Sequence, residues 1–540
     1  RQKQNDSADY FLGGRDATWL AIGASIFASN IGSEHLIGLA GAGASSGMAM
    51  AHWEIQGWMI LILGWVFVPF YSRSMVYTMP EFLERRYNPQ SRTILSVISL
   101  VSYVLTKVAV TVYAGGLVFQ QVFGIKELWG IDFFWIAAIG LVVLTALYTI
   151  FGGMKSVLYT SVLQTPILLL GSLIILVLGF KELGGWDEMM RVCGAVTVND
   201  YGDTMTNLIR SNDDANFPWL GALIGSAIIG FWYWCTDQFI VQRVLSGKNQ
   251  KEARRGTIFG AYLKLLPVFL FLIPGMIAFA LHQKYIGAGG EGFLPMLANG
   301  TANADAAFPT LVAKLLPAGV KGLVVCGILA ALMSSLASLF NSSAMLFTID
   351  FYKRFRPETP EKKLVGIGQI ATVVIVILGI LWIPIMRSVG DVLYTYLQDV
   401  QSVLAPGIAA AFLLGICWKR TSAQGGMWGL IAGMVIGLTR LGAKVYYSNA
   451  GEVADSTFKY LFYDMNWLFF CGWMFLFCII VVIVVSLATE APTAEKIQGL
   501  VFGTATKEQK AATRASWDHW DIIHTVIILA ITGAFYWYFW

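Results

Sequence analysis

Charged side chains are scarce in this chain of 540 residues, because Asp, Glu, Lys and Arg together make up only 13% of it. A soluble domain carries about 25% charged residues, and 56% hydrophobic residues leave too little polar surface to cover a soluble globule of this size. The composition therefore excludes a soluble enzyme, a disordered chain and a disulfide scaffold. A net charge of +4 is too small to indicate a nucleic acid partner.

Motifs for enzymatic chemistry are also missing from the sequence. The six cysteines have no metal or redox spacing, and all except Cys193, in a polar loop, lie inside apolar runs. The five histidines are scattered, with no HExxH motif and no recognisable Ser-His pairing. The sequence therefore gives no support to a membrane-embedded enzyme, and we expect a protein without catalytic residues.

Long apolar runs are what the chain does contain. A bilayer core about 30 Å thick is crossed by a helix of roughly 20 apolar residues. Thirteen runs predict an all-α, multi-pass integral protein of the cell membrane, without a soluble domain. They cover approximately residues 17–46, 48–72, 93–122, 130–151, 157–180, 218–243, 257–282, 321–350, 364–387, 391–418, 424–446, 465–488 and 519–540.

The basic residues predict the orientation of these helices. Of the 37 Lys and Arg, 24 fall in the set of loops that begins with residues 1–16, and two, Lys107 and Lys264, lie within helices. Cytoplasmic loops are enriched in Lys and Arg, so we expect residues 1–16 to be a cytoplasmic linker and Trp540 to face outward. The chain starts at Arg1 without a methionine or a recognisable signal peptide, so we expect a segment before it.

Eight ionisable side chains lie at predicted membrane depth, where they are costly and are functional candidates by default. For each one the alternative is a hydrogen bond or an ion pair that only holds helices together. The eight are Glu34, His35, His52, Glu54, Lys107, Asp237, Lys264 and Asp399.

Two runs contain the elements of a cation site. Asn30 and Gly32 weaken the first helix, and a break there would leave backbone groups that need a partner in lipid. In the eighth run, Ala331, Ser334, Ser335 and Ser338 share one helical face. Neutral oxygens suit a hard monovalent ion better than a divalent or transition metal. The alternative is close helix packing through small residues and serines.

The sixth run contains four consecutive aromatic residues, 231–234, followed by Thr236, Asp237 and Gln238. An interfacial aromatic belt is the alternative, but the position near mid-helix favours a ligand pocket. A sugar ring has an apolar face that lies on an aromatic plane, and its hydroxyls need both donors and acceptors. Such a mixed polar set is available in Asn30, His35, Glu54, Lys264 and Gln398.

At these residues the sequence resembles the solute:sodium symporter family, and within it the sodium/glucose cotransporters. The resemblance is dense over residues 8–440 and looser beyond. It is carried by long ordered strings: residues 9–43 (with ASNIGSEHLIG), 76–87 (VYTMPEFLERRY), 146–156 (ALYTIFGGMKS), 232–249 (WYWCTDQFIVQRVLSGKN), 261–267 (AYLKLLP), 332–352 (with MSSLASLFNSS) and 396–420 (with YLQDVQSVLAPG).

The resemblance implies a LeuT-like fold with two inverted repeats of five helices. The repeats would be residues 17–180, with a broken first helix, and residues 218–418. The outer loop 181–217 would join them, residues 419–540 would form peripheral helices, and a helix before Arg1 would bring the total to fourteen.

The resemblance also implies the residues of the sites. Sodium would be bound by carbonyls of Ala28, Ile31 and Ala331 and hydroxyls of Ser334 and Ser335. An outer lid would comprise Leu39, Trp53 and Tyr394, and Tyr233 would close the inner side. The solute would be bound by Asn30, His35, Glu54, Tyr233, Trp234, Lys264 and Gln398.

Two departures from the family pattern bear on function. Ser161 stands where members that use a second sodium have an aspartate, which indicates one sodium per sugar. The position of Asp399 is acidic in some sugar members and also in the inositol cotransporters. By contrast, Ser335 and Ala337 keep the MSSLAS string of the sugar members, where the inositol branch tends to carry acidic residues. We therefore expect a monomeric sodium symporter that imports a monosaccharide of the glucose or galactose type by alternating access. A myo-inositol cotransporter and a sugar-gated channel or sensor are the alternatives.

Overall fold

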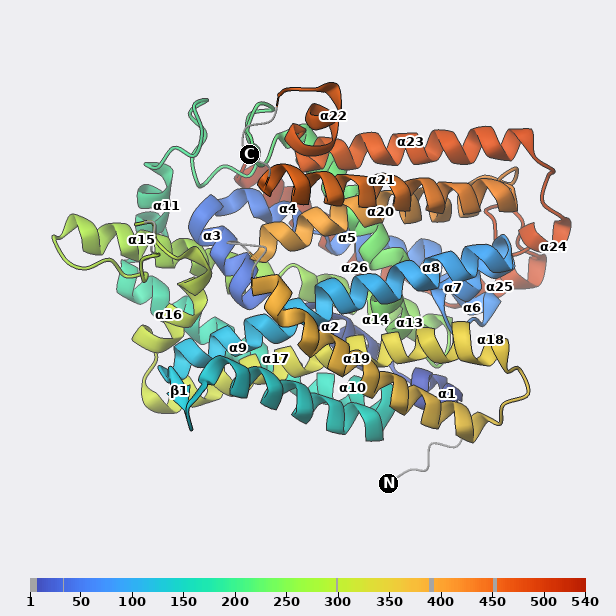
Figure 1. Ribbon diagram of the computed structural model, residues 1–540, viewed down its shortest axis with the longest axis horizontal. Coiled ribbons are helices and arrows are strands. Elements are labelled where there is room, and N and C mark those ends of the chain that lie inside the picture. Colours follow the sequence, from blue (N-terminus) through green and yellow to red (C-terminus); the bar gives the residue numbers. More distant parts are fainter. Residues whose placement is uncertain (1–6, 33, 298–299, 388–392, 450–453) are drawn as a thin grey trace.

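Long helices running roughly parallel to one another form the protein (Figure 1). The computed structural model describes residues 7–32, 34–297, 300–387, 393–449 and 454–540. Within these residues, ten helical segments are long and apolar enough to cross a membrane. The difference from thirteen arises because 35–74 and 133–183 each join parts of two predicted runs, and because only the short apolar segment 110–120 represents the third.

The N-terminal half consists of helices interrupted by π-helical and 3-10 turns, labelled η. A short hairpin of β1 (Glu127–Leu128) and β2 (Ile131–Asp132) precedes the longest helix. The helical elements are α1 (Ser7–Leu12), η1 (Gly13–Arg15), α2 (Trp19–Asn30), η2 (Glu34–Leu39), α3 (Ala40–Ser46), η3 (Gly47–Met50), α4 (Ala51–Glu54), α5 (Gly57–Ile62), η4 (Leu63–Phe67), α6 (Val68–Ser74), α7 (Met79–Arg86), α8 (Pro89–Ser102), η5 (Tyr103–Val108), α9 (Ala109–Phe123) and α10 (Phe133–Leu183).

The rest of the chain continues the same pattern. Its elements are α11 (Trp186–Gly194), α12 (Trp219–Gly230), η6 (Phe231–Thr236), α13 (Gln238–Leu245), α14 (Gln250–Lys264), η7 (Val268–Leu272), α15 (Ile273–Gly287), η8 (Ala304–Ala306), α16 (Ala307–Leu315), α17 (Ala318–Met345), η9 (Leu346–Tyr352), α18 (Lys353–Phe355), α19 (Glu361–Arg387), α20 (Leu393–Cys417), α21 (Ala423–Asn449), α22 (Thr457–Lys459), η10 (Tyr460–Asp464), α23 (Trp467–Ala488), α24 (Ala494–Ile497), α25 (Lys507–Ala515) and α26 (His519–Tyr538).

The predicted break in the first helix is confirmed. Helix α2 ends at Asn30, Ile31 has extended backbone (φ −78°, ψ 98°), and η2 begins at Glu34. The Ile31 N–H still donates to the Phe27 carbonyl, so the carbonyls of residues 28–31 lie beyond the last helical hydrogen bond. The sixth predicted helix is interrupted in a similar way, because η6 ends at Thr236 and the next residue, Asp237, also has extended backbone.

A kink at Gly153 divides α10, where two separate helices, 130–151 and 157–180, were predicted. Gly153 has a φ of 55°, and a Cβ there would lie 2.5 Å from the Tyr10 carbonyl oxygen, so only glycine fits. The Tyr10 hydroxyl donates to the Ile150 carbonyl at 3.2 Å. Residues 10–12 are therefore buried against the bundle, although the sequence placed them in a linker.

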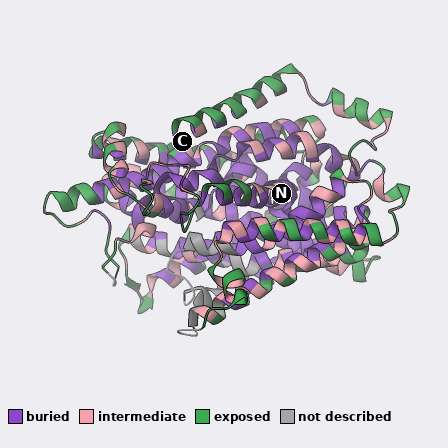
Figure 2. Cartoon of the chain, turned by 90° about the horizontal axis from the view of Figure 1, so that it is seen from above, coloured by how far each residue is buried: buried purple, intermediate pink, exposed green. Residues whose placement is uncertain are grey.

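The loops lie at two ends of the bundle, as the alternation of helices requires. Figure 1 shows α11, α15 and α16 at one end and α18, α24 and α25 at the other. Figure 2 shows buried residues concentrated along the centre of the bundle. The 181–217 loop is itself packed: Cys193, predicted in a polar loop, lies buried on α11, and the Met48 N–H donates to the Met205 carbonyl at 2.8 Å.

Candidate solute and cation sites

All seven residues predicted to bind the solute line a single cavity of about 40 Å³. A cavity of this size holds a few water molecules. The polar wall comes from α2, η2, α4, α14 and α20, and the aromatic wall from η6. The lining residues are Asn30, His35, Trp53, Glu54, Gln56, Ile229, Gly230, Tyr233, Trp234, Lys264, Gln398 and Gln401.

A buried charge cluster forms the polar wall. The Glu54 Oε2 atom lies 2.5 Å from Lys264 Nζ and 3.1 Å from His35 Nε2. Lys264 Nζ also donates to Asn30 Oδ1 at 3.2 Å. All four side chains are buried, and burying a charge requires both a partner and hydrogen bonds. The cluster therefore fixes a row of donors and acceptors along one side of the cavity.

The aromatic wall is held in place by the same cluster. The Tyr233 and Trp234 rings meet edge to face with centroids 4.9 Å apart, and Lys264 Nζ lies 5.3 Å from the Trp234 ring centroid. Asn30 Nδ2 donates to the Tyr233 hydroxyl at 3.2 Å. Both rings belong to the π-helical turn η6, a distortion that is frequent at functional sites.

Three polar atoms around the cavity are buried without a hydrogen-bond partner among the described residues: His35 Nδ1, Trp53 Nε1 and Gln398 Oε1. Buried polar groups are nearly always hydrogen-bonded. A polar ligand in the cavity would give these atoms partners, so they mark where hydroxyl groups could be recognised.

Lys107, to which sequence reasoning gave no role, lies against the aromatic wall. Its Nζ atom is 4.7 Å from the Tyr233 ring centroid and 2.6 Å from Asp237 Oδ2. The Tyr103 hydroxyl donates to the other oxygen of Asp237. The break after η6 and the ring of Tyr233 are thus attached to η5 by a buried ion pair.

His52, the other unassigned residue, has a packing role. Its Nε2 atom lies 3.0 Å from the Leu208 carbonyl and must donate to it, so Nδ1 accepts from the Tyr536 hydroxyl at 2.9 Å. This histidine fits the alternative stated for each buried ionisable group. It joins α4 to the 181–217 loop and to α26.

The residues predicted for sodium meet where α2 ends against α17. A Cβ on Gly32 would lie 2.9 Å from Ser335 Oγ, and Ser29 Oγ is 2.6 Å from Ser338 Oγ. Ser334 Oγ lies 3.3 Å from Ser161 Oγ on α10. Ala28 and Ile31, at the end of α2, and Ala331, on α17, are also buried. The junction therefore offers neutral hydroxyls and helix-end carbonyls, the kind of ligand that a hard monovalent cation accepts.

Of the three residues predicted for the outer lid, the structure describes the side chains of two, Leu39 and Trp53. Trp53 lines the cavity, whereas Leu39 is buried in η2 and is not among the lining residues. The side chain of Tyr394 lies outside the described residues, as does that of Asp399. The structure thus places one of the three lid residues against the cavity.

Sequence reasoning missed four lining residues, Gln56, Ile229, Gly230 and Gln401. Gln56 Nε2 donates to the Ser226 carbonyl at 2.8 Å, and a Cβ on Gly230 would lie 2.5 Å from Gln56 Oε1. Gln401 follows Gln398 by one helical turn, so the shared helix face was a signal that could have found it. The fit between Gly230 and Gln56 joins distant segments and left no signal in the sequence.

Comparison with known proteins assigns this geometry to a family. Residues 10–433 match the sodium:solute symporter family. The chain belongs to this family. This sodium:solute symporter is 36% identical to sodium/myo-inositol cotransporter 2 of Homo sapiens over 517 residues, 93% of this chain and 76% of the relative. It is 37% identical to the sodium/myo-inositol cotransporter of Canis lupus familiaris over 525 residues, 93% of this chain and 72% of the relative.

Solved structures show the same fold. A Na+-coupled sialic acid symporter, captured with substrate in an outward-open state, superposes with a TM-score of 0.71 at 22% identity, over 91% of this chain and 94% of the other. MhsT in complex with L-phenylalanine gives a TM-score of 0.51 at 13% identity, over 88% and 99% of the two chains. The symporter is a multi-pass, LeuT-like membrane transporter that uses sodium as its coupling ion, and it is not an enzyme.

Proposed function

We propose that this symporter imports a six-membered polyhydroxylated ring, a monosaccharide of the glucose or galactose type, together with sodium. The observation that carries the proposal is the cavity lined both by the charged cluster of Glu54, Lys264 and His35 and by the rings of Tyr233 and Trp234. Carboxylate, ammonium and amide groups can pair with several hydroxyls at once, while an indole face takes the apolar face of a ring. A few convergent polar groups in an apolar pocket are typical of small-molecule sites.

Sodium would bind where the end of α2 meets α17, through carbonyls of Ala28, Ile31 and Ala331 and hydroxyls of Ser334 and Ser335. Because Asn30, at the end of α2, also lines the solute cavity, an ion at this junction stabilises the conformation of α2 that the solute needs. Coupling of this kind is reciprocal, so sodium and solute tighten each other's binding by the same factor.

Alternating access then follows from the two walls. Trp53 covers the cavity on the side of the 181–217 loop, and Tyr233 covers it on the side of the Lys107–Asp237 pair. We infer that residues 17–180 and 218–418 are the two inverted repeats, that residues 419–540 are peripheral, and that the unit is a monomer. Each ligand shifts the conformations only by its differential affinity for them.

A cyclic polyol is the second candidate solute, because the relatives at 36–37% identity are sodium/myo-inositol cotransporters. The ring of myo-inositol carries a hydroxyl on every carbon, whereas a pyranose has a ring oxygen and a hydroxymethyl group. The donor and acceptor atoms described above can serve either ring. The choice between the two solutes therefore depends on whether the site has room for the hydroxymethyl group of a pyranose.

Uptake into proteoliposomes tests the proposal and separates the two candidates. With an inward sodium gradient, we expect accumulation of labelled glucose or galactose above the external concentration, and loss of accumulation when potassium or choline replaces sodium. Competition by glucose, galactose, mannose, fructose and myo-inositol ranks the solutes. Inhibition by myo-inositol alone would make the polyol the substrate, and equilibration without accumulation would indicate a channel or sensor.

A further inference from the structure

A tryptophan from a peripheral helix stacks on the tryptophan that covers the solute cavity. Trp467 is the first residue of α23, and its ring lies 5.5 Å from that of Trp53, centroid to centroid, with an interplanar angle of 24°. Trp53 is 5% exposed and lines the cavity, whereas Trp467 does not. Trp467 therefore contacts Trp53 but would not contact a solute bound in the cavity.

The start of α23 is fixed to the helix that leads into the aromatic wall. Gly221 and Gly225 of α12 form a Gly-x-x-x-Gly pattern, which lets helices approach closely in membranes. A Cβ on Gly225 would lie 2.8 Å from Leu468 Cδ2, so the residue after Trp467 packs directly on α12. Asn466 caps α23 by accepting the Leu468 N–H at 2.9 Å. Trp467 is thus held by a rigid backbone.

A second aromatic contact closes Trp53 from the outer loop. Phe217 meets the Trp53 ring at 6.0 Å with an interplanar angle of 69°. Asn466 Nδ2 donates to the Ala215 carbonyl at 2.7 Å, and Asp214 Oδ1 accepts the Phe217 N–H at 2.7 Å. Asn466, the cap of α23, therefore also holds the loop, so Trp467 and Phe217, two of the rings that contact Trp53, are attached to one point.

We propose that Trp467 is a gating residue that positions Trp53 over the outer mouth of the solute cavity. Opening the cavity on this side requires the Trp53 ring to leave its stack on Trp467 and its contact with Phe217, so each contact stabilises the outward-closed state. This role rests on the proposed transport function. It assigns part of the outer gate to α23, outside the two inverted repeats.

The accessibility of the cavity from the outside tests the role of Trp467. A cysteine at Ile229, which lines the cavity, reports access through its reaction with a membrane-impermeant thiol reagent, corrected for the parent chain with its native cysteines. In the I229C background, Trp467→Ala should raise the reaction rate from the outside roughly two- to tenfold, the population shift expected for one aromatic pair. The rate in inside-out vesicles should not rise.

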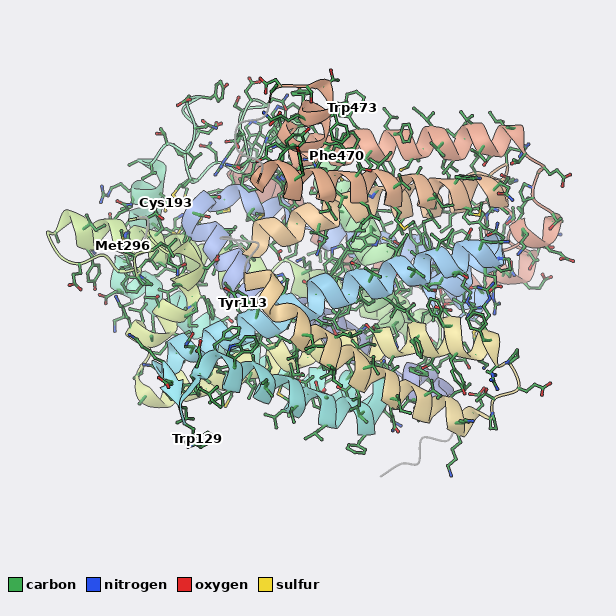
Figure 3. All side chains as sticks on the ribbon, in the orientation of Figure 1. Tyr113, Trp129, Cys193, Met296, Phe470 and Trp473 are labelled. Carbon is green, nitrogen blue, oxygen red and sulfur yellow. The ribbon has the colours of Figure 1, made fainter. Side chains whose placement is uncertain are left out.

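Two variants keep the test informative. Trp467→Phe retains a stacking ring and should restore most of the slow outside rate. Trp473→Ala is the matched control, because Trp473 lies on the same helix, is 62% exposed and points away from the bundle (Figure 3). It should leave both rates unchanged. If Trp467→Ala does not fold, Phe217→Ala should raise the outside rate in the same direction.

The proposal is overturned if Trp467→Ala and Phe217→Ala leave the outside rate unchanged, or if they raise the rates from both sides equally, as a general loosening would. Because the thiol reaction needs no solute, this result is independent of substrate identity. If the protein transports no cyclic solute but the thiol reaction rates change as expected, the proposed function is refuted and the gating role of Trp467 stands. Normal sugar uptake with unchanged rates would refute the gate alone.

Discussion

Lys107 and Asp237 form an ion pair of 2.6 Å in which both side chains are at most 3% exposed. The pair lies beside the Tyr233 ring and joins η5 to the break between η6 and α13. Removing one partner of a buried pair leaves an uncompensated charge, whereas removing both charges together costs much less.

Asp237→Asn should therefore reduce the free energy of unfolding by about 3–5 kcal/mol, measured by denaturation in detergent. The double variant Lys107→Met with Asp237→Asn should recover much of the loss. Glu188→Gln, in the exposed pair of Glu188 with Arg191, is the control and should leave the unfolding midpoint unchanged. If the double variant is no more stable than Asp237→Asn, the stability lost in Asp237→Asn does not come from an unpaired Lys107 charge.

Glu54→Gln should raise the half-saturating solute concentration about 10- to 100-fold, because hydrogen bonds to a charged group contribute about 1.5–3 kcal/mol. Sodium dependence measured at saturating solute should change little. Gln398→Ala should act in the same direction, since Gln398 Oε1 has no other partner among the described residues. Glu495→Gln on the exposed face of α24 is the control. Unchanged solute affinity in both cavity variants would place the solute elsewhere.

Ser335→Ala should produce the opposite pattern, with a higher sodium requirement and nearly unchanged solute affinity once sodium is saturating. The hydroxyl at this position faces Gly32 at the end of α2, where the cation is proposed to bind. Ser343→Ala, two turns further along α17, is the matched control. The sodium-activation curve of uptake provides the measurement, and a curve unaffected by Ser335→Ala would show that the cation site is misplaced.

One sodium should accompany each solute molecule. Ser161 Oγ donates to the Val157 carbonyl at 2.7 Å and contacts Ser334, and it brings no carboxylate for a second ion. The reversal potential of solute-dependent current in proteoliposomes measures the ratio directly. A ratio of two to one would contradict this prediction and leave the solute assignment intact.

Tyr536→Phe should destabilise the fold by about 1 kcal/mol, because it leaves His52 Nδ1 buried without a donor. Half-saturating solute and sodium concentrations should stay within about twofold of the parent, since His52 contacts Leu208 and Tyr536 and is not a lining residue. Thermal unfolding and uptake kinetics on the same preparation check both parts. A large loss of solute affinity without loss of stability would give His52 a role in the site.

Lipid made much of this arrangement predictable from sequence. Because an ionisable side chain at membrane depth must face the protein interior or a water-filled cavity, Glu54 and Lys264 were expected to join Asn30 in the wall of one solute pocket. In the structure, Lys264 contacts both Glu54 and Asn30. The family resemblance added the lid role of Trp53, which a pattern of apolar residues could not have distinguished from packing.

What the sequence did not reveal depends on contacts between distant segments. The π-helical turns that hold His35, Lys107 and Tyr233 change the face on which each side chain lies, and apolar periodicity has no signal for them. Trp467 looked like any aromatic residue at a helix end, and its stack on Trp53 exists only once α23 packs on α12. Likewise, Tyr10 was placed in a linker because the residues before it are polar, and nothing in the sequence indicated its contact with Gly153.

The contact between Tyr10 and the kink in α10 has a consequence for biogenesis. The residues joined by the Tyr10–Ile150 hydrogen bond are 140 positions apart. At synthesis rates of about 5–20 residues per second, the N-terminal segment must wait on the order of 10 s before its docking site has emerged. During that time the apolar residues Tyr10, Phe11 and Leu12 have no packing partner in the incomplete protein. We therefore expect the nascent chain to need protection from non-specific apolar contacts in this period.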